Sequence, residues 1–219
     1  MAKEKSEFVK NLKLTKPDDM EYYVPLTNDK EKHKFICRVE KLIRSSMEYR
    51  DYMQFLKDNV GLDSCTFFQS IGGNKKSRVS IEMHHEPFTL YDYVAVVLEK
   101  FINEGLPIND LNIADEVMLI HYENKVGLVP LSKTMHQVIH NSTKLIVPLN
   151  MVYGKYSDFL EEYEPYIDES LYDKLQRKLD MTKNLTAESF EAIKKEFSYL
   201  EVDGVDDLSK METASSEIA

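Results

Sequence analysis

The chain has 219 residues, of which 42% are hydrophobic and 30% charged, a composition typical of a globular protein with an apolar core. No apolar run approaches the roughly 18 residues of a transmembrane helix, and no signal peptide opens the chain, so we expect a cytoplasmic protein without membrane contact. The formal net charge of −10 is concentrated in residues 161–219, which hold 16 acidic and seven basic side chains, so nucleic-acid binding elsewhere is not excluded.

Residues 1–30 are polar and rich in lysine, and we expect a loosely packed arm there. Over residues 31–59, apolar side chains recur at helical spacing, which predicts one helix or two helices separated at Ser45-Ser46. Residues 63–70 and 79–83 are predicted strands of a β-hairpin, because a glycine-containing turn separates them and the second segment alternates.

Residues 88–101 form a strongly amphipathic pattern that predicts a helix ending before Gly105, and a second helix is expected over 111–122. The apolar segment 127–131 is a predicted strand, and Ser132 stands where the N-cap of a helix over 133–140 belongs. Further helices are expected over 155–164, 169–182 and 187–199, followed by an acidic tail, residues 201–219, that we expect to be disordered.

Four of the six histidines fall into two pairs. His84 and His85 are adjacent at the end of a predicted strand, so their side chains point to opposite sides. His136 and His140 are four residues apart on a predicted helix and therefore share one face. The helix pair plus one strand histidine would supply three imidazoles to a metal ion. His33 and His121 are interpreted as structural residues.

Three imidazoles leave coordination positions open for water or phosphate. A divalent ion there could polarise a phosphate oxygen, and a histidine that is not a ligand could accept a proton from water. Imidazole ligands favour Zn²⁺, Ni²⁺ or Mn²⁺, whereas Mg²⁺ prefers oxygen ligands. We therefore expect one divalent metal ion, with Mg²⁺, Mn²⁺, Ni²⁺ and Zn²⁺ all left open as its identity.

Two segments carry a resemblance to a known family. Residues 78–85 (RVSIEMHH) and 127–140 (GLVPLSKTMHQVIH) resemble the motif of the HNH, or ββα-metal, endonucleases. The motif is closest to that of the colicin-type DNases, and the segment before it is similar to the opening helix of phage-encoded HNH proteins. The resemblance covers roughly residues 45–142.

The resemblance implies a role for each matching residue. His85 would be the general base, Glu82 would orient a neighbouring arginine, and Arg78 would contact phosphate. Three histidines would bind the metal, namely His84, His136 and His140. The substrate would be DNA, more specifically double-stranded DNA, hydrolysed at its phosphodiester bonds.

The chain departs from the family pattern at several points. Gly127 stands where the motif has its middle asparagine, and Asn124 is the nearest residue that could substitute for it. Two predicted helices, over 88–123, stand where the family often has a short loop. Cys37 and Cys65 are interpreted as free thiols, and a structural zinc ribbon is not expected because only Cys65 falls in the relevant region.

Together these features predict an α+β, mostly helical protein. The resemblance implies a ββα-metal (HNH) core within residues 31–150, with the two-helix insertion at 88–123, helical flanks and a helical region over 151–200. The predicted function is a metal-dependent, phage-encoded DNA endonuclease in the host cytoplasm. The alternative is a non-catalytic phage binding or structural protein on the same scaffold, favoured by the missing asparagine and by an acidic carboxyl-terminal region that could bind a protein partner.

Overall fold

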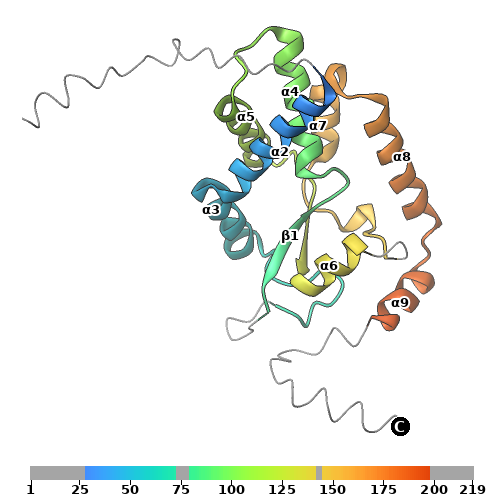
Figure 1. Ribbon diagram of the computed structural model, residues 1–219. Coiled ribbons are helices and arrows are strands. Elements are labelled where there is room, and N and C mark those ends of the chain that lie inside the picture. The colour runs from blue at the N-terminus through green and yellow to red at the C-terminus, as the bar shows by residue number, and fades with distance from the viewer. Residues whose placement is uncertain (1–27, 73–78, 142–144, 198–219) are drawn as a thin grey trace, which may run out of the picture.

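The computed structural model describes residues 28–72, 79–141 and 145–197 (Figure 1). Within these residues the protein is mostly helical and contains one two-stranded antiparallel sheet, which confirms the predicted α+β, mostly helical class. None of the helices in this part of the chain combines the length and apolar character that crossing a membrane requires.

The first two helices meet at Ser46, so of the two alternatives left open by the sequence the structure has two separate helices. Helix α2 (Asp29–Ser45) ends there, and the Ser46 hydroxyl accepts a hydrogen bond from the backbone N–H of Tyr49 at 3.1 Å, which caps α3 (Met47–Phe55). A π-helical turn, η2 (Leu56–Val60), continues α3 and ends at Gly61 in the left-handed conformation.

Helices α4 (Leu90–Glu104) and α5 (Asp110–Tyr122) confirm the two helices predicted between the halves of the histidine motif. A capping box joins Thr89 and Asp92 at the start of α4, and Asn109 caps α5. Both helices pack against α2 to form the main core. Its fully buried side chains include those of Phe35, Val39, Tyr93, Val97, Ile113, Val117 and Phe159.

The sheet pairs β1 (Ile81–His85) with β2 (Leu128–Ser132), with Met83 opposite Pro130 and His84 opposite Val129. The predicted hairpin between residues 63–70 and 79–83 is wrong. The earlier segment is a compact loop with a single β-bridge, between Ser64 and Gly72, because it turns its apolar side chains inward instead of extending them along β1. Of the predicted turn, residues 73–78 lie outside the described residues.

Those inward-facing side chains start a second core, to which β1 contributes Ile81 and β2 contributes Val129 and Leu131. Its buried residues include Cys65, Phe67, Ile71, Ile81, Val129, Leu131, Met135, Val147 and Phe190. Cys65 is buried and Cys37 exposed, and both are free thiols, as expected.

Helix α6 (Lys133–Asn141) follows β2 without an intervening loop. The backbone N–H of Met135 donates to the Ser132 hydroxyl at 3.3 Å, so Ser132 caps the helix as predicted. The chain therefore folds back at Ser132 and lays α6 against β1 (Figure 1). A short 3-10 turn, η3 (Leu149–Met151), comes next.

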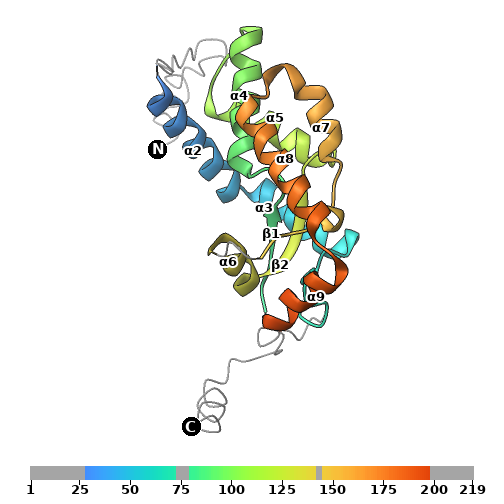
Figure 2. The ribbon, with the colours of Figure 1, turned by 90° about the vertical axis from the view of Figure 1, so that its right-hand side faces the viewer.

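The remaining helices run along the outside of the molecule, and they confirm the three predicted carboxyl-terminal helices. They are α7 (Tyr156–Tyr163), the 3-10 turn η4 (Glu164–Tyr166), α8 (Glu169–Asn184) and α9 (Ala187–Glu196). Helix α8 extends from the helical end of the molecule to the sheet end (Figure 2). The expected arm falls largely, and the acidic tail wholly, outside the described residues, which begin at Asn28 and end at Phe197.

Candidate metal centre

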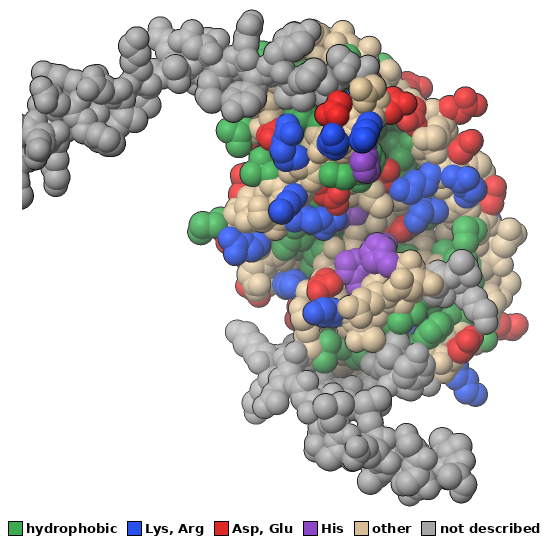
Figure 3. Space-filling model, viewed as in Figure 1, with side chains coloured by type: hydrophobic (Ala, Val, Ile, Leu, Met, Phe, Trp, Pro, Cys, Tyr) green, Lys and Arg blue, Asp and Glu red, His purple; other side chains and the backbone are tan. Residues whose placement is uncertain are grey.

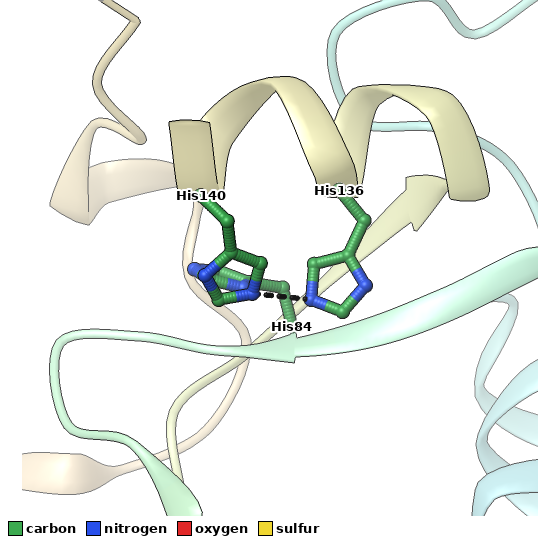
Figure 4. A group of neighbouring side chains, drawn as sticks. All are labelled: His84, His136 and His140. Carbon is green, nitrogen blue, oxygen red and sulfur yellow. Dashed lines mark hydrogen bonds between the residues drawn. The ribbon is translucent and has the colours of Figure 1, made fainter. Parts of the chain in front are cut away.

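Three histidines from two elements converge beside the sheet. His84 lies on β1, and His136 and His140 lie one turn apart on α6 and point down onto that strand (Figure 4). One potential ligand atom from each residue lies within 4.8 Å of those of the other two. The ring of His84 is 5.1 Å from each of the other two rings, centroid to centroid. The structure thus brings together the three histidines that the resemblance singled out as ligands.

The spacing of the ring nitrogens suits a single metal ion. Nε2 of His136 and Nε2 of His140 face each other at 3.0 Å. Two nitrogens bound tetrahedrally at about 2.05 Å from Zn²⁺ would be about 3.3 Å apart, so a movement of a few tenths of an ångström would admit the ion. Three imidazoles and no thiolate form a donor set that fits Zn²⁺, Ni²⁺ or Cu²⁺ better than Mg²⁺.

Glu82 holds the ring of His136 in place. Its Oε2 lies 2.8 Å from Nδ1 of His136, so Nδ1–H donates to the carboxylate and leaves Nε2 for a metal. The resemblance implied that Glu82 orients a neighbouring arginine, and among the described residues its side-chain partner is His136. Arg78, the expected phosphate contact, lies outside the described residues.

Glu86 supports His84 in a similar way, and the sequence analysis missed it. Nε2 of His84 lies 3.3 Å from Oε2 of Glu86, whose other oxygen pairs with the ammonium of Lys178 on α8. Only 3% of Glu86 is exposed. Burial alone would raise the pKa of this carboxyl, but the hydrogen bond from His84 and the charge of Lys178 hold it below its usual value.

His140 is suited to act as a ligand near neutral pH. Partial burial lowers its pKa below the usual 6.5, and the neighbouring charges of His136, Arg44 and Lys178 act in the same direction. A neutral imidazole is the form that binds a metal. Lysine and arginine side chains (blue) lie on the same face of the molecule as the histidine patch (purple) in Figure 3, together with acidic side chains (red).

The structure does not bring His85 to the three histidines. Adjacent strand residues face opposite sides, and His85 turns into the main core, where 5% of it is exposed. Nδ1–H of His121 donates to the carbonyl of Val117 at 2.7 Å, so Nε2 of His121 accepts from Nε2–H of His85 at 3.1 Å. Burial lowers the pKa of His85 well below 6.5, with His121 acting in the same direction. His85 is therefore a neutral residue enclosed in the core. His121 is buried, as expected of a structural histidine.

Gly127 stands at the motif's asparagine position for a steric reason. A Cβ atom there would lie 1.8 Å from the backbone oxygen of Glu86. The backbone N–H of Gly127 instead donates to the Tyr93 hydroxyl at 3.1 Å, and its carbonyl accepts from the N–H of Glu86 at 3.0 Å. Asn124 does not take over a bridging role, because its side-chain oxygen is buried without a hydrogen-bond partner in the described part of the chain.

Comparison with known proteins identifies the family. No curated protein and no solved structure matches the chain. A family model, described as Bacteriophage G278-like virion protein, matches residues 1–207. This match covers nearly all of the 219 residues, and it agrees with the phage origin expected from the sequence. The chain therefore belongs to the G278-like family of bacteriophage virion proteins.

Proposed function

We propose that this chain is a component of the phage particle that binds one divalent transition-metal ion through His84, His136 and His140. The observation that carries the metal part is the convergence of three imidazoles from β1 and α6 within 4.8 Å. Glu82 and Glu86 add support, since each fixes one of these rings from behind, as outer carboxylates commonly do at metal sites. Membership in a family of virion proteins supports the phage particle, and not the host cytoplasm, as the location of this chain.

A bound ion would connect β1 to α6. These two elements are otherwise joined by the Glu82–His136 pair and by packing, so the metal would act as a cross-link at the border of the two cores. A metal that binds only the folded state stabilises it, by an amount that grows with the logarithm of the free metal concentration above the Kd. Such a cross-link suits a protein that has to survive outside the cell.

Calorimetric titration with Zn²⁺, Ni²⁺, Mn²⁺ and Mg²⁺ tests the metal site. We expect one equivalent of Zn²⁺ or Ni²⁺ to bind and to raise the melting temperature, and Mg²⁺ to bind much more weakly. His140→Ala should abolish both effects. The matched control is His33→Ala, an exposed histidine on α2. Unchanged Zn²⁺ and Ni²⁺ binding by His140→Ala would exclude the site.

DNA hydrolysis at the same centre is a second candidate function. The observation that favours it is the order of β1, β2 and α6, which carries the three histidines at the places where the ββα-metal resemblance expects them. An ion bound there would stabilise charge on a phosphate, and Arg44 and Lys178 would add positive charge nearby. Since His85 is enclosed, water itself or a group outside the three histidines would have to accept the proton.

Plasmid DNA incubated with the metal-loaded protein separates the two candidates. Nicking that requires metal and is lost in His140→Ala would support the nuclease. Protein that binds metal and is folded, yet leaves the plasmid intact with every ion, would exclude the nuclease and retain the first proposal. His85→Ala is the informative third arm, because activity that survives in this variant rules out His85 as the base.

A further inference from the structure

The outward side of α5 carries apolar side chains that nothing in the described part of the chain covers. Leu111, Leu119 and Tyr122 are 64%, 48% and 50% exposed. Their spacing of eight and three residues places them along one side of the helix. The opposite side of α5 is also apolar and is buried in the main core. The outward apolar side chains therefore lie on a helix whose other side is already packed in the core, and an exposed apolar patch of this kind marks an interaction site.

The start of α3 lies against the Tyr122 end of this side. The Tyr122 hydroxyl donates to Oε1 of Glu48 at 2.6 Å, and the Tyr122 ring packs edge-on against Tyr52 at 5.5 Å between centroids. These contacts hold the start of α3 against the end of α5, at the left of the molecule in Figure 1. Met47, the first residue of α3, is 72% exposed. We call Met47, Leu111, Leu119 and Tyr122 the α5 surface.

Acidic side chains stand within and beside the α5 surface. Asp115 is exposed and lies on the helix between Leu111 and Leu119, and it forms no ion pair with any described residue. Glu48 and Asp51 lie close to Tyr122, at the other end of the surface from Leu111. Partial burial raises the pKa of Tyr122 to about 12, and the hydrogen bond to Glu48 and the charge of Asp51 add to that increase. The surface is therefore apolar with negative charge at its centre and at one end.

This charge pattern argues against a second copy as the occupant. Two copies meeting about a twofold axis at the middle of the stripe would set α5 against α5 and Asp115 against Asp115. Two like charges leaving water together are strongly unfavourable, and the net charge of −10 adds repulsion between copies. A lysine or arginine on a different protein would instead form a favourable pair with Asp115.

We propose that the α5 surface docks another protein of the phage particle, one that presents an apolar patch with a basic side chain opposite Asp115. This proposal rests on the proposed location of the chain in the virion. It does not involve the metal centre, because none of its residues contacts the three histidines.

Photo-crosslinking in purified particles tests the proposal. Phage is grown with a photoreactive phenylalanine analogue in place of Leu119, and in a second culture in place of Met181, a matched position on α8 that is 41% exposed. We expect position 119, and not 181, to crosslink to a different virion protein, within an apolar segment that contains lysine or arginine. Asp115→Lys should lower the crosslink yield at least tenfold, while Asp173→Lys, an exposed aspartate on α8, should leave it unchanged.

The remaining outcomes would all contradict the proposal, and they differ in whether they also contradict the proposed function. Crosslinks from position 119 to a second copy only, or to nucleic acid only, would overturn it. A chain that is present in particles without any crosslink from position 119 would overturn it and leave the proposed function intact. A chain that is absent from particles would overturn both. Circular dichroism of each purified variant verifies that folding is retained.

Discussion

His136 and Glu82 are 54 positions apart in the chain, yet Nδ1 of His136 lies 2.8 Å from Oε2 of Glu82. This contact joins α6 to β1 and selects which nitrogen of His136 faces the other two histidines. A ligand that is fixed in this way loses less conformational freedom when a metal binds.

Replacing Glu82 with alanine should therefore weaken metal binding without removing a ligand. We expect the affinity for Zn²⁺ or Ni²⁺ to fall about 10- to 100-fold, the usual effect of losing an outer-shell partner. Calorimetric titration measures it. Glu161→Ala, an exposed glutamate on α7, is the control and should bind with unchanged affinity. Equal affinities for the two variants would mean that Glu82 plays no part in the site.

Lys178 compensates the buried charge of Glu86, so Lys178→Met should destabilise the protein. Of the residues that the structure describes in α8, only Leu171 is buried. The ion pairs of Lys174 with Asp92 and of Lys178 with Glu86 are therefore important for holding α8 against the rest of the protein. We expect the free energy of unfolding to fall by about 1–3 kcal/mol, the cost of a buried group that loses a partner. Urea denaturation followed by circular dichroism measures this change.

Lys183→Met on the same helix provides the control for Lys178→Met. The Lys183 side chain is 70% exposed and its Nζ lies 3.9 Å from Oδ1 of Asp180. Its loss should change stability by less than about 0.5 kcal/mol. A similar effect of both substitutions would show that Glu86 does not depend on Lys178.

Acidification should destabilise the protein through His121. Burial lowers the pKa of His121 from 6.5 to about 4 in the folded state. Between these two values the unfolded chain binds the proton more readily, so stability is present above pH 6.5 and falls as the pH drops toward 4. The shift corresponds to about 3 kcal/mol for this residue.

Urea denaturation at several pH values measures this dependence. His121→Gln should be less stable at neutral pH and should lose less stability between pH 6.5 and 4. His33→Gln, which alters an exposed histidine, should keep the full dependence. A wild-type free energy of unfolding that is constant between pH 6.5 and 4 would contradict the lowered pKa of His121.

Restoring the motif asparagine at Gly127 should damage the fold. The added Cβ would meet the backbone oxygen of Glu86 at 1.8 Å, and backbone cannot move aside as a flexible side chain can. We expect Gly127→Asn to lose about 3 kcal/mol or more, visible as a lower melting temperature or as insoluble protein. Gly61→Asn is the control, since a Cβ atom added to Gly61 would have no other atom within 4 Å and asparagine tolerates the left-handed conformation. A stable, folded Gly127→Asn would contradict the steric argument.

Local rules were enough to predict most of the helices. The Ser132 hydroxyl caps a helix where the sequence placed the cap, and α4 ends at Gly105. Each of these signals acts over three or four residues, within the reach of one side chain and its neighbouring backbone groups. The shared face of His136 and His140 follows from the same short-range geometry.

The pairing of segments that lie far apart in the chain could not be predicted from such local signals. The strand partner of β1 proved to be residues 128–132 and not 63–70, because burial of Cys65, Phe67 and Ile71 favours a compact loop for the earlier segment. Both segments are short and contain apolar residues that a strand could bury, so only the energy of packing distinguishes the two pairings.

The sequence by itself therefore predicted most of the helices, the cap at Ser132 and the spacing of the histidine pairs. Strand geometry states that the side chains of His84 and His85 diverge, and the motif resemblance named His84 as the ligand. Only the tertiary structure decided that His85 enters the core and lies against His121. It also decided the partners of Glu82 and Glu86, which depend on elements that meet only after folding. Side-chain periodicity is set within one element, whereas the composition of a site is set by how elements pack.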